Sequence, residues 1–260
     1  MPEYKYINIT QLTKKSIELS LFGILEKHIE IIDKKYTTSY YQSLDYIYKL
    51  NPMYCGIYVD YLVRKTISCI TNQPFNDMRA DHVIKYKNPP KKLIDSYNYC
   101  KSNNTELCLL KLCDVMQFHS LAFHTQPNIK IINSIKTYLE TNYFDLKPLM
   151  IDLIKDNKVI LNPDLGLTYN KLKIKGDADL IIGRTLYDIK CTKNNSNTYL
   201  RQLLAYMALI SIKYKNITID KICILNLYRS EIIYYNVAHI TNEMLLTYMT
   251  RLNQQVESTD

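Results

Sequence analysis

Residues that interrupt regular structure are scarce in this sequence. Of its 260 residues only 5 are glycine and 8 are proline, so long helices and strands are expected with few tight turns. No apolar run reaches the roughly 18 residues that a membrane-spanning helix needs, and the first residues do not follow the pattern of a secretory signal. We therefore expect a chain that neither spans a membrane nor enters the secretory pathway.

Cysteines with metal-binding spacing are also missing. The 7 cysteines include no Cys-x-x-Cys pair, which argues against a zinc ribbon. Most of them lie beside apolar residues, as Cys108 does between two leucines, and this is typical of reduced cysteines in a core. The expected location is therefore intracellular: the cytoplasm, the nucleus or, for a virus-encoded chain, the interior of a host cell.

The chain carries a moderate excess of positive charge. The chain has 33 basic and 25 acidic residues, a formal net charge of +8, and a hydrophobic content of 47% that is ordinary for a globular protein. A positive excess suits an anionic partner such as nucleic acid. A lysine-rich solvated surface would carry the same excess, and charge alone favours that plainer interpretation.

The order of the expected elements predicts an α/β fold. Apolar residues recur at helical spacing through much of 1–157, whereas short strands dominate 158–260. The second region predicts a β-meander, a crossover helix, two more strands and a last helix, which together form a mixed sheet flanked by helices. We expect one compact domain. Helices are predicted at 9–34, 53–70, 106–123, 129–141, 146–155, 197–213 and 242–255, a loop at 75–92, and strands at 159–161, 165–169, 172–182, 185–191, 221–228 and 231–237.

A hairpin within the second region carries acidic residues. The pair Gly183-Arg184 has the chemistry of a two-residue turn, with glycine in the positive-φ position. Such a turn pairs Ile182 with Thr185 and, counting back, places Asp179 opposite Asp188.

The same register places Asp177 opposite Lys190, so all four polar side chains would project from one face of the hairpin. The other face would carry an apolar set that suits a core: Ala178, Leu180, Ile182, Tyr187 and Ile189.

Two facing carboxylates are destabilising without a counter-charge. A divalent cation between Asp179 and Asp188 would supply one, and Lys190 on the same face could stabilise charge on a phosphate. The alternative is a solvent-exposed polar face whose carboxylates turn toward nearby lysines. Pairing geometry alone leaves both interpretations open.

Three motifs of this region resemble those of a known family. Gly176-x-x-Asp179, followed by Asp188-x-Lys190, resembles motifs II and III of the PD-(D/E)xK nuclease superfamily. Gln202-Leu-Leu-Ala-Tyr206 resembles the Gln-x-x-x-Tyr helix of its RecB-like branch, and the segment Tyr187–Cys191 is similar to the corresponding strand of lambda-exonuclease-type proteins. The resemblance covers about residues 158–210 and implies a restriction-endonuclease-like core.

The resemblance implies a role for particular residues. The implied site consists of Asp179 and Asp188 as ligands of Mg²⁺ or Mn²⁺, the backbone carbonyl of Ile189 as a further ligand, Lys190 as the catalytic lysine, and Gln202 and Tyr206 as residues that support the site or contact nucleic acid. The plainer interpretation of the last two is a polar and an amphipathic residue on a helix that packs over the sheet. The Gly176 spacing selects Asp179 over Asp177 as the ligand.

The family also has an acidic residue on an upstream helix. The pattern Gly56-x-x-x-Asp60-x-x-x-Arg64 resembles motif I of the lambda-exonuclease-like group, in which glutamate is the more usual acid. Asp60 would then contribute to metal binding and catalysis, Arg64 would contact nucleic acid or support the site, and Gly56 would let the helix approach the sheet closely. The alternative is an exposed ion pair between Asp60 and Arg64, which stabilises a helix by only a few tenths of a kcal/mol.

The sequence therefore predicts a metal-dependent nuclease that hydrolyses phosphodiester bonds in DNA. An exonuclease or a processing nuclease in replication, recombination or repair is the leading hypothesis. Two alternatives stay open: a catalytically silent nucleic-acid-binding module of the same fold, and an RNA endonuclease.

Overall fold

The fold is known from a computed structural model. It describes residues 5–9, 23, 25, 28–36, 41–73, 84–85, 90–102, 129–142, 145–169, 172–194 and 196–257. In these residues the chain has an α/β fold with mixed sheets, as predicted. None of the described helices is long and apolar enough to cross a membrane.

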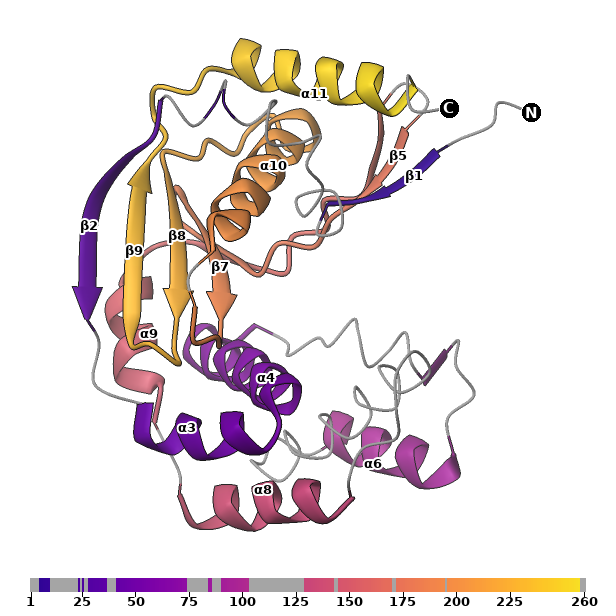
Figure 1. The fold of residues 1–260 in the computed structure, drawn as a ribbon, viewed down its shortest axis with the longest axis vertical. Coiled ribbons are helices and arrows are strands. Elements are labelled where there is room, and N and C mark those ends of the chain that lie inside the picture. Colours follow the sequence, from indigo (N-terminus) through magenta and orange to yellow (C-terminus); the bar gives the residue numbers. More distant parts are fainter. Residues whose placement is uncertain are drawn as a thin grey trace.

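The larger sheet has six strands in the order β2-β9-β8-β7-β6-β3 (Figure 1). Neighbouring strands are antiparallel except for β7 and β8, which are parallel and are connected by the crossover helix α10, Asn197–Lys213. The strands span Glu30–Tyr36 (β2), Val159–Leu161 (β3), Leu180–Ile182 (β6), Thr185–Lys190 (β7), Lys221–Asn226 (β8) and Glu231–Asn236 (β9).

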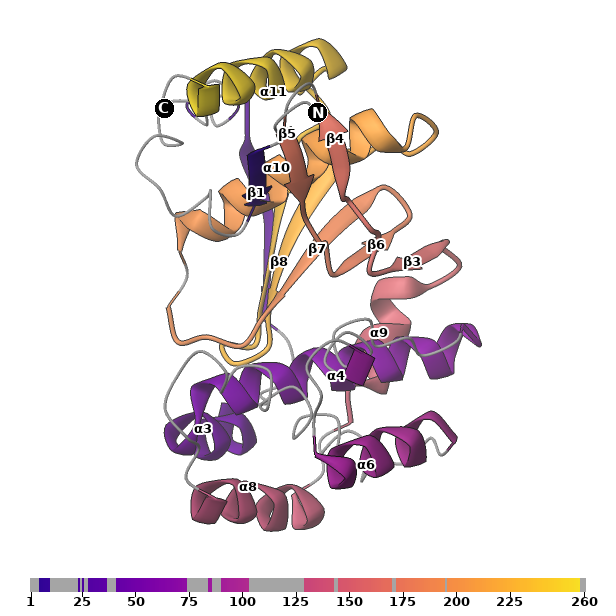
Figure 2. The same cartoon turned by 90° about the vertical axis from the view of Figure 1, so that its right-hand side faces the viewer.

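The smaller sheet has three strands and lies beside α10 and α11 (Figure 2). Its central strand β5, Leu172–Lys175, pairs in parallel with β1, Lys5–Asn8, and in an antiparallel manner with β4, Leu167–Tyr169.

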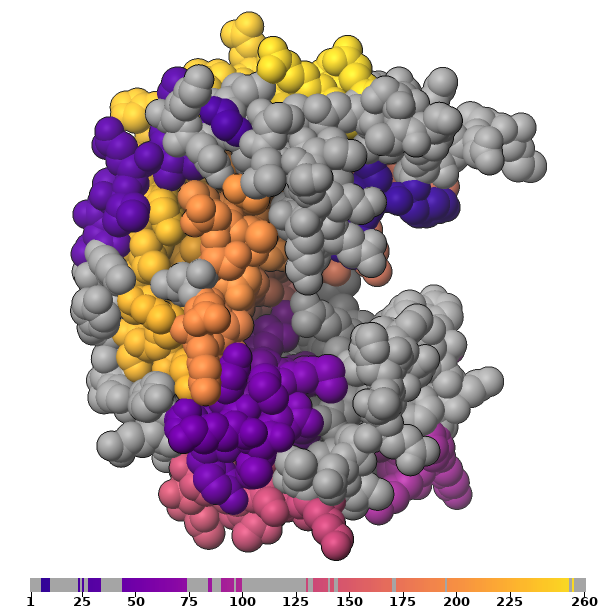
Figure 3. Space-filling model, in the orientation of Figure 1, coloured from indigo at the N-terminus to yellow at the C-terminus, as the bar shows by residue number. Residues whose placement is uncertain are grey.

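The remaining helices gather at two places. Below the carboxyl ends of β7 and β8 lie α3, α4, α6 and α8, with α9 packed against α4, whereas α11 lies on the far side of α10 (Figures 1 and 2). The space-filling view in Figure 3 shows the surfaces of α3 and α4 below the sheet and that of α11 at the opposite end. Their bounds are Tyr41–Leu50 (α3), Pro52–Thr71 (α4), Lys91–Ser102 (α6), Ile129–Thr141 (α8), Lys147–Ile154 (α9) and Asn242–Glu257 (α11).

The helix α4 begins and ends at well-defined caps. The Asn51 side chain accepts a hydrogen bond from the backbone N–H of Tyr54, Pro52 occupies the first turn, and Asn72 closes the helix in the left-handed region with φ of 54°. These local signals set the residue at which α4 begins, and so which of its side chains contact the sheet.

The larger sheet is buried on both faces. One core cluster joins α3, α4 and α9 to sheet residues such as Leu180 and Tyr187. The other joins α10 and α11 to Ile181, Leu186 and Ile224. Because residues alternate along β7, the Asp188 side chain lies on the same face as Leu186, which belongs to the α10-side cluster, and Asp188 is buried. A carboxylate in such surroundings is costly unless it is paired or has a function.

The N-terminal prediction is wrong in its last part. The expected helix 9–34 ends in strand β2, and β1 was not expected at all. These two segments form strands because they pair with β5 and β9, which lie more than 150 residues away in the chain. The local periodicity of the sequence does not reveal such pairing. Residues 10–22 and the expected helix 106–123 lie outside the described residues. The helices α3 and α6 are present where no helix was predicted.

The long strand predicted for 172–182 is also wrong. It is two strands, β5 and β6, which belong to different sheets and are separated by residues 176–179. Asp177 consequently forms an isolated antiparallel bridge with Asp164 and does not pair with Lys190. Because the chain leaves the sheet here, the alternation of faces is interrupted, and Ala178 joins the α10-side cluster and not that of Leu180.

Two glycines give a matched test of backbone requirements. Gly183 has φ of +58°, and a Cβ there would lie 2.9 Å from Oδ1 of Asn157, so Gly183→Ala is expected to destabilise the fold by about 1–2 kcal/mol. Around Gly56 no described atom beyond the neighbouring residues and backbone of its own helix lies within 4 Å of such a Cβ, so the expected close approach of this residue to the sheet is absent. Gly56→Ala should therefore stabilise α4 by about 0.5–1 kcal/mol. Urea unfolding measures both, and a stabilised Gly183 variant would contradict the turn assignment.

Candidate active site

The hairpin has the predicted register. Ile182 pairs with Thr185 and Leu180 with Tyr187 across the Gly183-Arg184 turn. The ladder of β6 ends at Leu180, and the preceding Asp179 continues the contact through its side chain: its Oδ2 accepts a 2.7 Å hydrogen bond from the backbone N–H of Ile189. Asp179 is thereby held beside the end of β7.

Asp188 is the most deeply buried acid of the site. Its residue surface is 2% exposed, Oδ1 accepts a 2.7 Å hydrogen bond from Nζ of Lys190, and Oδ2 has no hydrogen-bond donor among the described residues. Burial raises the pKa of Asp188 to about 7; Lys190 acts against this rise, and the neighbouring Asp179 carboxylate adds to it. A buried carboxylate oxygen without a donor indicates a place where a cation or a proton is needed.

Lys190 remains a cation in these surroundings. Burial lowers its pKa, but the carboxylates of Asp188 and Asp179 outweigh burial, so the pKa of Lys190 lies above its ordinary value. Its Nζ also lies 5.0 Å from the centre of the Tyr199 ring on α10, within the range of a cation–π contact. Lys190 is therefore placed to hold positive charge beside two carboxylates.

The helix α4 brings a third carboxylate to the same place. Nε of Arg64 donates a 2.8 Å hydrogen bond to Oδ1 of Asp60, and Nη2 of Arg64 lies 3.8 Å from Oδ1 of Asp179. Arg64 is only 4% exposed. The predicted i,i+4 pair is present, but it is largely buried and faces the hairpin, so a single guanidinium links Asp60 to Asp179.

Gln202 and Tyr206 lie together on α10. Nε2 of Gln202 donates a 2.6 Å hydrogen bond to the Tyr206 hydroxyl, and Tyr206 is 3% exposed. The Tyr206 ring packs against Gly176, where an added Cβ would lie 3.1 Å from Cε1 of the ring. Tyr206 also contributes to the raised pKa of Lys190. The helices α10 and α4 belong to the core clusters on opposite faces of the larger sheet.

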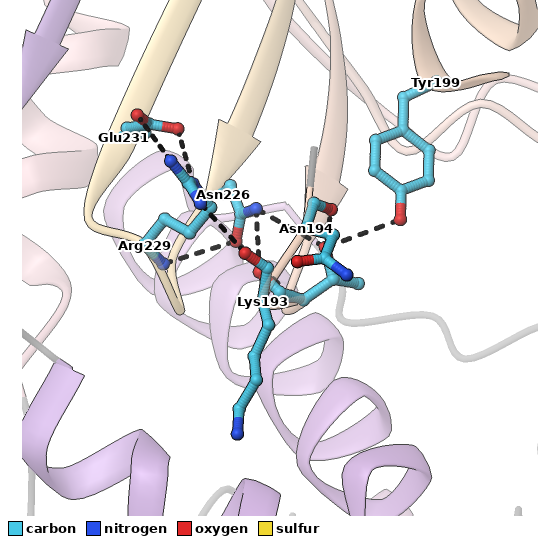
Figure 4. A network of polar contacts seen from close by, with 7 residues as sticks. Lys193, Asn194, Tyr199, Asn226, Arg229 and Glu231 are labelled. Carbon is cyan, nitrogen blue, oxygen red and sulfur yellow. Dashed lines mark hydrogen bonds and ion pairs between the residues drawn. The ribbon is translucent and has the colours of Figure 1, made fainter. Parts of the chain in front are cut away.

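A polar network missed by the sequence prediction fixes the loop that follows Lys190 (Figure 4). The fully buried Asn226 on β8 donates a 3.0 Å hydrogen bond to the backbone carbonyl of Thr192. Arg229 donates to the carbonyl of Lys193 and forms a 2.8 Å ion pair with the buried Glu231. In the sequence this network is indicated only by polar residues within otherwise apolar strands. That pattern does not reveal which residues they contact.

The residues present fit a divalent cation in part. Carboxylate oxygens of Asp179 and Asp188 are ligands that Mg²⁺ prefers, and the donor-free Oδ2 of Asp188 is available for one. The carbonyl role of Ile189 stays a prediction, since only its N–H has a described contact with Asp179. Within the described ranges, no group of three or more His, Cys, Asp or Glu residues is close enough to hold a metal ion as arranged.

Comparisons with known proteins add no assignment to this geometry. No family model, no curated protein and no solved structure matches the chain.

Proposed function

We propose that the chain is a metal-dependent nuclease that hydrolyses phosphodiester bonds in DNA, acting as an exonuclease or a processing nuclease in replication, recombination or repair. The observation that carries the proposal is the buried Asp188 carboxylate, which has one oxygen paired with Lys190 and the other without a donor. Clustered carboxylates beside a lysine, with a strongly perturbed pKa among them, are typical of sites that handle charge on a substrate.

The order of the elements supports the same proposal. Around the larger sheet, the helix α4 precedes the antiparallel strands β3, β6 and β7, then the crossover helix α10, the parallel strand β8 and the antiparallel strand β9. The helices α6, α8 and α9 lie between α4 and β3 in the chain, and the strands β4 and β5 of the smaller sheet lie between β3 and β6. This arrangement agrees with the restriction-endonuclease-like core that the PD-(D/E)xK resemblance implies. The motif residues Asp60, Asp179, Asp188 and Lys190 come from two of these elements and the segment before β6. Arg64 pairs with Asp60 and Asp179, Lys190 pairs with Asp188, and the N–H of Ile189 joins Asp179 to β7.

In the proposed site each residue has a physical role. Asp179 and Asp188 would hold Mg²⁺ or Mn²⁺, which when bound polarises the phosphate and lowers the pKa of a water. Lys190, being protonated, stabilises negative charge on the phosphate and does not accept a proton. Without a bound metal ion, Arg64 supplies the positive charge that compensates Asp60 and Asp179.

The nucleic-acid partner rests on charge and on the proposed chemistry. The chain carries a net charge of +8, which favours phosphate contacts whose strength falls with salt. Gln202 and Tyr206 are proposed to support the site on the α10 side.

A cleavage assay on matched substrates tests the proposal. Purified full chain is incubated with end-labelled single- and double-stranded DNA and RNA in Mg²⁺, Mn²⁺ or EDTA. We expect cleavage of DNA with either metal and none in EDTA, because the carboxylate pair alone cannot activate a water. Cleavage of RNA alone would favour the RNA endonuclease, and nucleic-acid binding without cleavage of any substrate would contradict the nuclease.

A silent nucleic-acid-binding module is the second candidate, and one observation favours it. Arg64 and Lys190 already pair with Asp60, Asp179 and Asp188, which is how a site without metal would satisfy its carboxylates. A melting temperature that does not change with Mg²⁺ at millimolar concentration would support this candidate over the enzyme.

A further inference from the structure

Two buried cysteines lie against each other beside the candidate site. Cys55 is on α4 and Cys191 directly follows β7, and their sulfur atoms are 3.3 Å apart. Cys55 is fully buried and Cys191 is 7% exposed, and neither forms a disulfide in the structure. The Cys55 thiol also contacts the backbone carbonyl of Leu44 at 3.8 Å. The sequence prediction treated the cysteines as separate core residues and did not foresee the pair.

We propose that Cys55 and Cys191 form a reversible disulfide, an oxidative modification site of this protein. A disulfide holds its sulfur atoms about 2.05 Å apart, so the two atoms must approach by little more than about 1 Å. The two residues are 136 positions apart in the chain, and the fold alone brings them together. The inference rests on this geometry and is independent of the proposed nuclease activity.

A peroxide is the oxidant that the site would use. The Cys191 thiolate attacks one peroxide oxygen: an S–O bond forms, the O–O bond breaks, and the departing hydroxide takes a proton to leave as water. Cys55 then attacks the Cys191 sulfur of the sulfenic acid, the S–S bond forms, and a second water leaves. Two thiols and one hydrogen peroxide give one disulfide and two waters, and a small-molecule thiol reverses the change by exchange. Cys191 reacts first because it is the more exposed of the two.

The disulfide would join the two elements that supply the candidate site. Cys55 precedes Asp60 and Arg64 on α4, and Cys191 follows Asp188 and Lys190. Oxidation therefore fixes the distance between the helix and the end of β7, and reduction releases it.

Two other cysteines serve as internal controls. Cys223 is fully buried on β8, and Cys69 is exposed near the end of α4. If exposure alone governed oxidation by peroxide, Cys69 would react first. If burial alone governed it, Cys223 and Cys55 would be equally unreactive. Only the paired geometry predicts a specific bond between Cys55 and Cys191.

Thiol trapping followed by peptide mapping tests the proposal on the full chain. The protein is treated with hydrogen peroxide or with dithiothreitol, unfolded in N-ethylmaleimide, digested, and analysed by mass spectrometry. We expect a peptide pair linked through Cys55 and Cys191 after peroxide, and two alkylated peptides after dithiothreitol. Alkylated Cys55 and Cys191 at a peroxide dose that oxidises Cys69 would overturn the proposal, as would bonds to other cysteines only.

Thermal melting gives a second readout with matched variants. Closing so long a loop should raise the melting temperature of the oxidised wild type by roughly 5–10 °C. The rise should persist in Cys223→Ala and vanish in Cys55→Ala and Cys191→Ala. A rise in melting temperature that survives in both Cys55→Ala and Cys191→Ala would overturn the proposal. If a variant fails to fold, peptide mapping of the oxidised wild type still tests the proposal.

Discussion

Asp188→Asn is expected to abolish metal-dependent cleavage, with a loss of roughly 10³-fold or more, while the fold stays as stable as before or becomes more stable. Asparagine has nearly the size of aspartate but lacks the charge that a divalent cation needs. In the wild type three carboxylates, Asp60, Asp179 and Asp188, face the cations of Arg64 and Lys190. In the variant the two remaining carboxylates, Asp60 and Asp179, balance the two cations, Arg64 and Lys190. The buried negative charge at position 188 is removed. Nucleic-acid binding should survive, because phosphate contacts to other basic residues carry it.

The stability gain should depend on pH. Because burial raises the pKa of Asp188 from 3.8 to about 7, the folded wild type binds this proton more tightly than the unfolded chain does. Wild-type stability in metal-free buffer should therefore fall as pH rises from about 4 to about 7, and Asp188→Asn should lack this decrease. Urea unfolding at pH 5 and pH 8 measures the difference, which should be larger at pH 8.

Asp177→Asn is the matched control. Asp177 is exposed, lies two residues before Asp179, and forms its backbone bridge with Asp164 away from the site. It should keep both the activity and the stability of the wild type. Equal loss of activity in both variants, or full activity in Asp188→Asn, would contradict the assignment of Asp188.

Arg64→Met is expected to lower the free energy of unfolding by about 3–5 kcal/mol in metal-free buffer, because removing one partner of a buried ion pair leaves the other charge uncompensated. Methionine keeps much of the aliphatic volume but no charge. Asp60 and Asp179 would then lose the guanidinium that links them, so a divalent cation should bind more tightly. Mg²⁺ should raise the melting temperature of the variant by more than that of the wild type.

Arg184→Met provides the comparison for this variant. Arg184 forms a 2.6 Å ion pair with Asp220, but its side chain is 63% exposed, so its loss should cost less than about 1 kcal/mol. If Arg64→Met is no less stable than Arg184→Met, the contacts of Arg64 with Asp60 and Asp179 are not holding the site together. A Mg²⁺ effect no larger than in the wild type would show that the carboxylates do not attract a cation.

The parts of the fold that local chemistry determines were predictable from the sequence. Gly183-Arg184 specifies its own turn type, and from that turn the pairing of Ile182 with Thr185 follows by counting. The crossover helix was predicted at 197–213, and α10 spans these residues, because Ser196 caps its start and apolar residues recur at helical spacing. The proximity of Asp60 to Asp179 was expected only from the resemblance, since no local pattern joins α4 to the hairpin.

Other parts depended on contacts that a sequence does not display. The strand predicted for 172–182 ends at Lys175, and the next residue, Gly176, packs against Tyr206, which lies 30 positions away in the chain. Asn226 and Glu231 were hidden in apolar strands, and their partners Thr192 and Arg229 are ordinary loop residues. Tertiary pairing outweighs local propensity at all of these positions.

The pairing of β2 with β9 has a consequence for synthesis. The register joins Glu30 to Asn236, so on a translating ribosome the β2 segment has no partner strand until almost the whole chain has emerged. Such non-local pairing slows folding and leaves strand edges open in the interval, when they can pair with other chains. The region 158–260, expressed alone, would lack β2 at its edge and α4 against one face. The regions 1–157 and 158–260 are thus expected to fold as one unit, late and together.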